Sequence, residues 1–100
     1  MAKSEEEIKS DIKAYIQKSG SGYGAWYVGI SKDARDRLFR GHGVHEKGDL
    51  WIWRQAQSST VARNIEAYFV NTLDTDGAPG GGDKDADYVY AYKKAAHTTP

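Results

Sequence analysis

The chain has 100 residues, with 14 Lys and Arg against 14 Asp and Glu, and it contains no cysteine. A chain of this length buries about two thirds of its unfolded surface, so we expect a single domain over residues 1–100 with a modest core. A net charge of zero gives no general attraction to nucleic acid, and the absence of cysteine excludes disulfides and thiolate metal sites. The absence of cysteine suits a reducing cytoplasm.

No segment of the sequence has the features of a signal peptide or of a membrane span. The N-terminus lacks a basic region followed by an apolar run, and no apolar stretch approaches the ~18 residues that a transmembrane helix needs. We therefore expect a cytoplasmic protein that makes no membrane contact.

The first element that the sequence predicts is a helix from Ser4 to about Lys18. Ser4 and Glu7 form a capping box, and the glutamates of the first turn suit the positive end of the helix dipole. An apolar stripe at helical spacing follows, formed by Ile8, Ile12, Tyr15 and Ile16. A glycine-rich loop over residues 19–24 ends the helix.

A strand is expected next, over Ala25–Ile30. The segment is short, continuously apolar and rich in residues that favour β structure, so we place it in the centre of a sheet. Gly29 has no side chain to pack, which is typical of a bulge or of a close approach by another group. A substrate or a neighbouring helix could make that approach.

A second helix should follow, with Ser31 or Asp33 as its cap and Gly41 and Gly43 at its end. Its inward face is expected to consist of Ala34, Leu38 and Phe39. Its outward face is charged and consists of Lys32, Arg35, Asp36 and Arg40. The segment therefore presents several cations next to the first strand.

Leu50–Ala56 alternates aliphatic and aromatic residues, as in a strand whose two faces are both partly covered. The clearest amphipathic helix begins near Val61, after three residues that cap helices well. Its apolar series is Val61, Ile65, Tyr68, Phe69 and Leu73.

The rest of the chain is expected to form a loop, one strand and a tail. Residues 74–87 have the composition of a mobile loop, and Tyr88–Tyr92 alternates as a strand does. The tail over residues 93–100 is expected to fray. Alternation of helix and strand with short connections predicts an α+β domain with a small, mostly antiparallel, three-stranded sheet flanked by three helices.

Four residues, in this order and in these kinds of element, resemble the GIY-YIG nuclease family. They are Tyr27 in the tripeptide Tyr27-Val28-Gly29, Arg37 on the next helix, His42, and Glu66 in the third helix. In that family a tyrosine-glycine strand, an arginine on the next helix and a glutamate on a later helix converge on one active site. The resemblance covers residues 26–73 and implies a magnesium-dependent endonuclease that acts on DNA.

The sequence departs from the family pattern at its beginning. Family members carry a GIY strand a short distance ahead of the YIG strand, whereas residues 16–22 here are the end of a helix and a glycine loop. A circularly permuted arrangement would account for this if the C-terminal strand filled the missing place in the sheet. Tyr90 or Tyr88 would then replace the missing tyrosine, and residues 1–24 would be an addition to the family domain.

The resemblance implies a role for each matching residue. Glu66 would bind a single Mg²⁺, a hard cation that keeps most of its waters and needs only one or two carboxylates. Arg37 would hold a non-bridging phosphate oxygen with its planar guanidinium. Tyr27 would orient or deprotonate the attacking water, and His42 would contact phosphate or assist proton transfer. Tyr90 would complete the catalytic set, and the substrate-binding residues expected around it are Gly29, Lys32, Arg35 and Arg40.

The same residues also have plain structural explanations. Tyr27 could simply be a core residue of an aromatic strand. Arg37 could pair with Asp33 on the helix surface, and Glu66 could form a solvated pair with Arg63. The histidine could be an ordinary loop residue. What favours the catalytic reading is the combination of residues in the family's order.

A calcium-binding loop is not expected. The acidic residues that copy the opening of an EF-hand loop are Asp83, Asp85 and Asp87. Tyr88 and Lys94 stand where that loop requires glycine and a bidentate glutamate.

A closed zinc site and a phosphate-binding glycine loop are also not expected. His42 and His45 have a spacing that could let them share a metal, but there is no cysteine, and His97 lies in the tail that is expected to fray. Gly80–Gly82 lacks the Gly-Lys-Ser/Thr ending of a phosphate loop.

The sequence therefore predicts a small endonuclease that hydrolyses DNA phosphodiester bonds with Mg²⁺. The main alternative is a catalytically inactive module of the same fold that binds nucleic acid, with exposed Trp51 or Trp53 as stacking platforms. Its positive surface would consist of Lys32, Arg35, Arg37, Arg40 and Arg54. A protein-interaction adaptor built on the Trp and Tyr residues is a third hypothesis. In so short a chain, specificity would come from loops, a partner protein or oligomerisation.

Overall fold

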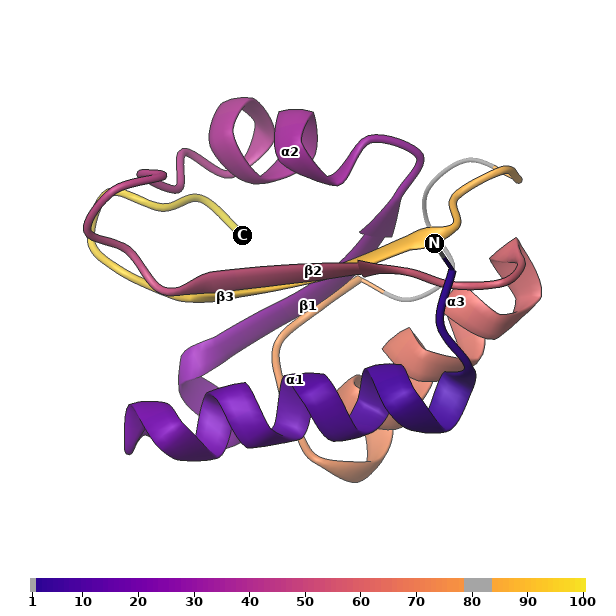
Figure 1. The fold of residues 1–100 in the computed structure, drawn as a ribbon. Coiled ribbons are helices and arrows are strands. Elements are labelled where there is room, and N and C mark those ends of the chain that lie inside the picture. The colour runs from indigo at the N-terminus through magenta and orange to yellow at the C-terminus, as the bar shows by residue number, and fades with distance from the viewer. Residues whose placement is uncertain (1, 79–83) are drawn as a thin grey trace.

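A computed structural model describes residues 2–78 and 84–100 of the chain. It is an α+β fold with a three-stranded antiparallel sheet and three helices, as the sequence predicts (Figure 1). The strands are β1 (Trp26–Ser31), β2 (Trp51–Gln55) and β3 (Tyr88–Lys93). The predicted glycine segment Gly80–Gly82 lies outside the described residues, and so does Asp83 of the EF-hand-like sequence.

The sheet order is β1-β3-β2, so the last strand of the chain lies between the other two. Both neighbours are antiparallel to β3, and Tyr90 pairs with Gly29 on one side and with Trp53 on the other. The prediction that the first strand is central is therefore wrong, because β1 is an edge strand of this sheet. β1 is apolar because each of its residues is buried, even though the strand lies at the edge of the sheet.

The outer edge of β1 is covered by the segment that follows the third helix. The amide of Val28 donates to the carbonyl of Asp76 at 3.0 Å, and the amide of Asp76 donates to the carbonyl of Trp26 at 2.8 Å. Tyr27 and Asp76 form an isolated parallel bridge. This backbone pairing satisfies the edge of β1 and fixes the start of the long loop.

Helices cover both faces of the sheet (Figure 1). The first face carries α1 (Glu5–Ser19) and α3 (Ser59–Ala67), which bury the isoleucines of α1 against Val28, Val89 and Ala91. The other face carries α2 (Ala34–Asp36) and the C-terminal tail. The strand alternation therefore sends the aliphatic residues of β3 to one face and its tyrosines to the other.

The predicted caps are present. Ser4 and Glu7 form the capping box of α1, and Gly20 ends that helix in the left-handed conformation with φ of 80°. Asp33 caps α2 by accepting from the amide of Asp36, and Ser58 caps α3 by accepting from the amide of Val61. Helix boundaries depend on local side-chain chemistry, so the sequence predicts where these three helices begin.

Two helices change to π-helical turns before they end. The α2 turn continues as a π-helical segment over Arg37–Gly41, and α3 continues as one over Tyr68–Thr72. The amide of His42 donates to the carbonyl of Arg37 at 2.9 Å, five residues back along the chain. π-Helical turns widen the helix locally and are frequent at functional sites.

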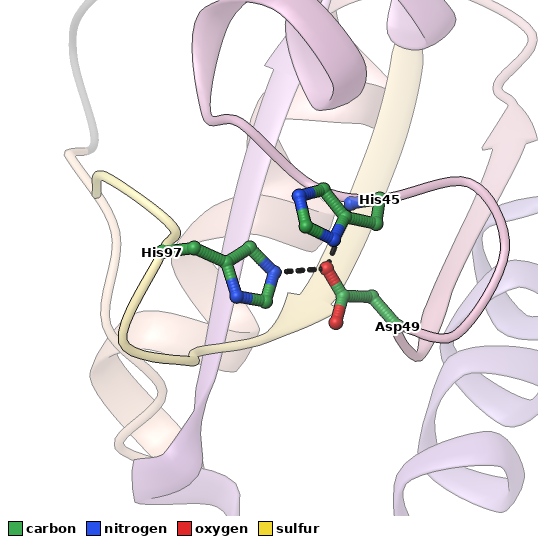
Figure 2. Close-up of side chains that lie close together, drawn as sticks. All are labelled: His45, Asp49 and His97. Carbon is green, nitrogen blue, oxygen red and sulfur yellow. Dashed lines mark hydrogen bonds and ion pairs between the residues drawn. The ribbon is translucent and has the colours of Figure 1, made fainter.

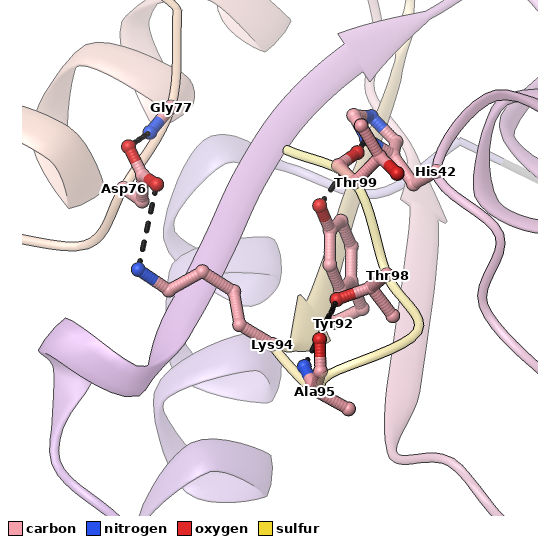
Figure 3. Close-up of polar contacts among 8 residues, drawn as sticks. All are labelled: His42, Asp76, Gly77, Tyr92, Lys94, Ala95, Thr98 and Thr99. Atoms are coloured by element: carbon pink, nitrogen blue, oxygen red, sulfur yellow. Dashed lines mark hydrogen bonds and ion pairs between the residues drawn. The ribbon is translucent and has the colours of Figure 1, made fainter.

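The C-terminal tail folds back onto the sheet instead of extending away from it. His97 lies beside Asp49 of the loop before β2 (Figure 2). The amide of Thr99 donates to the carbonyl of His42 at 2.8 Å, while Thr98 and Ala95 close a turn with three hydrogen bonds (Figure 3). We expected fraying because the tail is short and polar, but its backbone and side chains have partners on three other segments.

Among the helices of residues 2–78 and 84–100, none combines the length and the apolar character that crossing a bilayer requires.

Candidate active site

A small cavity of about 60 Å³ lies beside β1 and brings most of the predicted site residues together. The residues that line it are Tyr27, Gly29, Ile30, Arg37, Glu66, Ala78 and Tyr90. Four of the five predicted catalytic residues therefore meet at one place, although they come from four different elements. A volume of this size admits a few water molecules.

Each side chain reaches the cavity because of its place in the fold. Tyr27 and Gly29 share one face of β1, since they are two residues apart on a strand. Tyr90 enters from β3, opposite Gly29 in the register. Arg37 comes from the first residue of the π-helical turn after α2, and Glu66 comes from the last turn of α3 on the opposite face of the sheet.

The absence of a side chain at Gly29 makes room for Tyr90. A Cβ atom at position 29 would lie 2.5 Å from the Tyr90 hydroxyl oxygen and 2.6 Å from its Cζ. The close approach expected at this glycine therefore comes from a tyrosine of the neighbouring strand, and not from a substrate or a helix. A residue with a side chain at this position would displace the phenol from the cavity.

His42 lies behind Tyr90 and does not line the cavity. Its Nε2 is 2.7 Å from the Tyr90 hydroxyl, and its Nδ1 is 2.7 Å from the carbonyl oxygen of Thr99. Its side chain is buried and packs against Tyr27, with 4.7 Å between the ring centroids. Because both nitrogens already have partners, the imidazole is placed to act through Tyr90 rather than to contact phosphate.

The hydrogen bonds of His42 define its tautomer. Burial lowers the pKa of His42, against the raising effect of the Thr99 carbonyl and with a further lowering by the Arg37 charge, so the ring is neutral at pH 7. A carbonyl oxygen can only accept, so Nδ1 carries the proton and donates to Thr99. Nε2 is then an acceptor, and the Tyr90 hydroxyl donates to it.

Glu66 is a buried carboxyl group, with 4% of its surface exposed. Burial raises the pKa of Glu66 to about 7, against the opposing charge of Arg63. Glu66 is therefore not solvated, as the surface pair would require, although the charge of Arg63 still acts on it. A carboxyl group held in a cavity with a raised pKa is typical of sites that bind a cation or transfer a proton.

The tyrosines of the site are protonated at neutral pH. Burial raises the pKa of Tyr27, and the charges of Glu66 and Asp76 raise it further against the lowering effect of Arg37. Burial also raises the pKa of Tyr90 far above its ordinary value. A protonated Tyr27 suits the orientation of a water molecule by hydrogen bonding better than the removal of a proton from it.

The side chain of Arg37 packs back over Gly41. A Cβ atom at position 41 would lie 2.9 Å from Cδ of Arg37, so the glycine accommodates the aliphatic stem of the arginine. The wider π-helical turn joins these two residues, since it runs from Arg37 to Gly41. The guanidinium position therefore depends on the glycine that the sequence only marked as a helix end.

The other predicted substrate-binding residues lie outside the cavity. Lys32 and Arg35 line a separate depression of about 280 Å³ with Trp53 and Tyr88. Arg40 is exposed on the helix surface, where it pairs with Asp36 at 3.7 Å. Of the expected substrate-binding set, only Gly29 lines the cavity with the catalytic candidates.

Sequence reasoning missed three residues around the site. The carbonyl oxygen of Thr99 accepts a hydrogen bond from Nδ1 of His42. Asp76 lies at the edge of β1, where its charge acts on Tyr27. The hydroxyl of Tyr92 lies 3.2 Å from Nδ1 of His42 (Figure 3). The alternation of Tyr90 and Tyr92 could have indicated Tyr92, but no sequence signal pointed to a tail threonine.

Glu66 provides the carboxylate that a magnesium ion would need. Burial raises its pKa to about 7, and a bound cation would favour the ionised carboxylate. A different group of possible ligands lies in the loop before β2 and the C-terminal tail. His45, Asp49 and His97 place one ligand atom each within 4.8 Å of the others (Figure 2). The described chain thus has two distinct places with metal-binding chemistry.

The fold and the site carry the functional argument alone, since comparison of the chain with protein-family models, with curated proteins and with solved structures found no match in any of the three.

Proposed function

We propose that the protein hydrolyses DNA phosphodiester bonds with Mg²⁺, as a circularly permuted relative of the GIY-YIG nucleases. The observation that carries this proposal is the shared cavity, where Tyr27, Arg37, Glu66 and Tyr90 meet. A tyrosine pair, an arginine and a buried carboxyl group in one small cavity can serve phosphoryl transfer.

The position of β3 supports the permuted arrangement. β3 lies beside β1 with Tyr90 opposite Gly29, so a tyrosine strand adjoins the tyrosine-glycine strand from the far end of the chain. Of the two tyrosines considered for this role, Tyr90 lines the cavity. Tyr88 instead packs edge-on against Trp53, with 5.5 Å between the ring centroids.

The hydrogen-bond chain behind the cavity offers a route for the proton of the attacking water. The hydrogen of Tyr90 is donated to Nε2 of His42, so the lone pairs of the Tyr90 oxygen can accept a proton from water in the cavity. As water attacks phosphorus and the P–O bond to the leaving oxygen breaks, the water proton passes to Tyr90 and the proton of Tyr90 passes to His42. The leaving alkoxide takes a proton from solvent, and His42 later returns its proton to solvent. No free phenolate forms, which agrees with the strongly raised pKa of Tyr90.

The remaining residues bind and orient. Arg37 lines the cavity and neutralises a non-bridging phosphate oxygen, and Tyr27 orients the water. The carbonyl oxygen of Thr99 stabilises the imidazolium of His42 by accepting a hydrogen bond from Nδ1. Mg²⁺ bound by Glu66 would supply the positive charge that the phosphate oxygens need during the reaction.

The direct test is cleavage of labelled single-stranded, duplex and branched DNA with and without Mg²⁺. Wild-type protein should cleave at least one of these substrates only with the metal. Glu66→Gln keeps the shape of the side chain and should abolish cleavage, whereas Glu6→Gln, an exposed carboxylate on α1, should not. Cleavage that persists in Glu66→Gln would remove the proposed metal-binding role.

A second candidate function is nucleic-acid binding without cleavage. The depression formed by Lys32, Arg35, Trp53 and Tyr88 favours it, because cations and aromatic rings together bind single strands. Some of this positive charge is already paired within the protein, since Arg35 bonds to Glu46 at 3.0 Å. Retention of DNA without cleavage in the same assay would support this function, and absence of retention would support a protein-interaction adaptor.

A further inference from the structure

A second cluster of ligand-type side chains lies outside the cavity and shares no residue with it. His45 and Asp49 come from the loop before β2, and His97 comes from the C-terminal tail (Figure 2). The two imidazole rings are stacked, with 4.0 Å between centroids and 12° between planes. One ligand atom from each residue lies within 4.8 Å of the other two.

We propose that His45, Asp49 and His97 form a Zn²⁺ site. Two imidazole nitrogens and one carboxylate oxygen are a ligand set that zinc binds, and three protein ligands leave a fourth position for water. Magnesium prefers an all-oxygen environment, so this set disfavours it. The site is separate from Glu66 and does not depend on the proposed nuclease function.

The existing hydrogen bonds hold the ligands near each other. Oδ2 of Asp49 accepts from the backbone amide of His45 at 2.7 Å and contacts Nε2 of His97 at 2.5 Å. The second oxygen of Asp49 can bind zinc while Oδ2 keeps the amide of His45, which fixes the orientation of the carboxylate. One outer-shell hydrogen bond, from the amide of His45, is therefore already present, and the stacked rings need only turn to direct a nitrogen each at one ion.

The ligand side chains can be reached from solvent. The Asp49 side chain is 14% exposed and that of His97 is 38% exposed. A solvated ion can therefore approach, and zinc binding would break the hydrogen bond between His97 and Asp49 so that Nε2 of His97 can face the ion.

The backbone of the loop suits this arrangement. Gly43 has a φ of 72° and Gly48 a φ of 106°, a region that residues with side chains rarely adopt. A Cβ atom at position 43 would lie 3.2 Å from the carbonyl oxygen of His97. The two glycines thus let the loop turn tightly while the tail approaches it.

Zinc at this site would fasten the tail to the loop. Two residues beyond His97, Thr99 accepts the proton of His42 and donates its amide to the His42 carbonyl. A bound zinc ion would therefore restrain the C-terminal tail, whose Thr99 orients His42. Binding to the folded state alone would raise the stability of the protein.

The test is zinc titration of tag-free, metal-stripped protein in competition with a chromophoric chelator. We expect one Zn²⁺ per chain, with Mg²⁺ failing to displace it. Cobalt substitution, read from its visible absorption, should report nitrogen and oxygen ligands at low coordination number. His97→Ala, His45→Ala and Asp49→Asn should each weaken zinc binding by about tenfold or more.

Two controls make the outcome decisive. Lys47→Ala, in the same exposed loop, should bind zinc as the wild type does, and so should Glu66→Gln. Zinc should raise the melting temperature of the wild type and leave that of His97→Ala unchanged. The proposal is overturned if the wild type shows no saturable zinc binding, or if binding persists unchanged in His97→Ala and Asp49→Asn. Loss of cleavage in the nuclease assay would leave both results unaffected.

Discussion

The hydroxyl of Tyr90 lies 2.7 Å from Nε2 of His42, in a bond that joins the centre of the sheet to the end of the π-helical turn. The bond is buried, and it links a residue that lines the cavity to one that does not. It therefore lets His42 affect the cavity only through Tyr90.

Tyr90→Phe is expected to lower the rate of DNA cleavage by about 10²–10⁴, the range typical of lost acid-base catalysis. The substitution removes the hydroxyl and leaves Nε2 of His42 without its donor, which destabilises the fold by about 1–3 kcal/mol. Single-turnover kinetics and urea unfolding measure the two effects. Tyr23→Phe, whose hydroxyl bonds only weakly to Gln17 at 3.3 Å, is the matched control.

Gly29→Ala is expected to disturb the site through sterics alone. The new Cβ atom would lie 2.5 Å from the Tyr90 hydroxyl oxygen, so the phenol must move away from His42. Overpacking of this kind destabilises a protein by about 1–3 kcal/mol and should also reduce cleavage. Thermal unfolding and the cleavage assay measure this, and Gly24→Ala is the control because nothing lies within 4 Å of its Cβ position. Equal stability of the two variants would contradict the close approach.

Gly41→Ala is expected to shift the stem of Arg37, because the added Cβ atom would lie 2.9 Å from Cδ of the arginine. Arg37 is a flexible side chain, so the stability should change little while the guanidinium moves. We expect weaker binding of DNA substrate and slower cleavage, measured as KM and kcat. Gly22→Ala, with open space at its Cβ position, should leave both unchanged.

Glu66 should make the stability of the metal-free protein depend on pH. Its folded-state pKa of about 7 lies above its ordinary value of 4.5, so the folded protein binds this proton more tightly than the unfolded chain does. The contribution is fully present below about pH 4.5 and is lost as the pH rises through 7. The loss amounts to about 3 kcal/mol at about 1.4 kcal/mol per pKa unit.

Urea unfolding between pH 4.5 and 8, in the presence of a chelator, measures this dependence. Glu66→Gln should flatten the decline, because its side chain does not titrate. Added Mg²⁺ should restore stability to the wild type at pH 8 and leave Glu66→Gln unchanged, since the ion favours the ionised carboxylate. The structure indicates that the carboxyl group of Glu66 is desolvated, and an identical pH profile in the wild type and the variant would contradict this.

Local chemistry made much of the fold predictable from the sequence. The capping box of Ser4 and Glu7, the caps at Asp33 and Ser58, and the aliphatic and aromatic alternation of β2 each depend on residues within a few positions of one another. The α+β class follows from the order of these elements. Such features are encoded in short segments, so the sequence determines them without knowledge of the fold.

The resemblance to the GIY-YIG nucleases also indicated four of the residues that line the cavity, through their order and types, together with His42, which does not line it. It could not establish that they meet, because Tyr27, Arg37, Glu66 and Tyr90 lie on four elements separated by up to 63 positions along the chain. Their convergence depends on β3 entering the sheet between β1 and β2, which is a choice of strand order. Strand order is decided by how the whole chain packs its apolar faces, and no local pattern expresses it.

The tail shows the same division most clearly. Its short polar sequence predicted fraying, yet the structure joins Thr99 to His42 and His97 to Asp49. Both contacts span about half the chain, so their formation depends on where the loop after α2 lies in space. The sequence by itself determined the helices, the strands and the chemical types at the site. Only the tertiary structure decided that the last residues of the chain hold His42 in place and bring two histidines and an aspartate together, because these contacts are long-range and their free energy comes from packing.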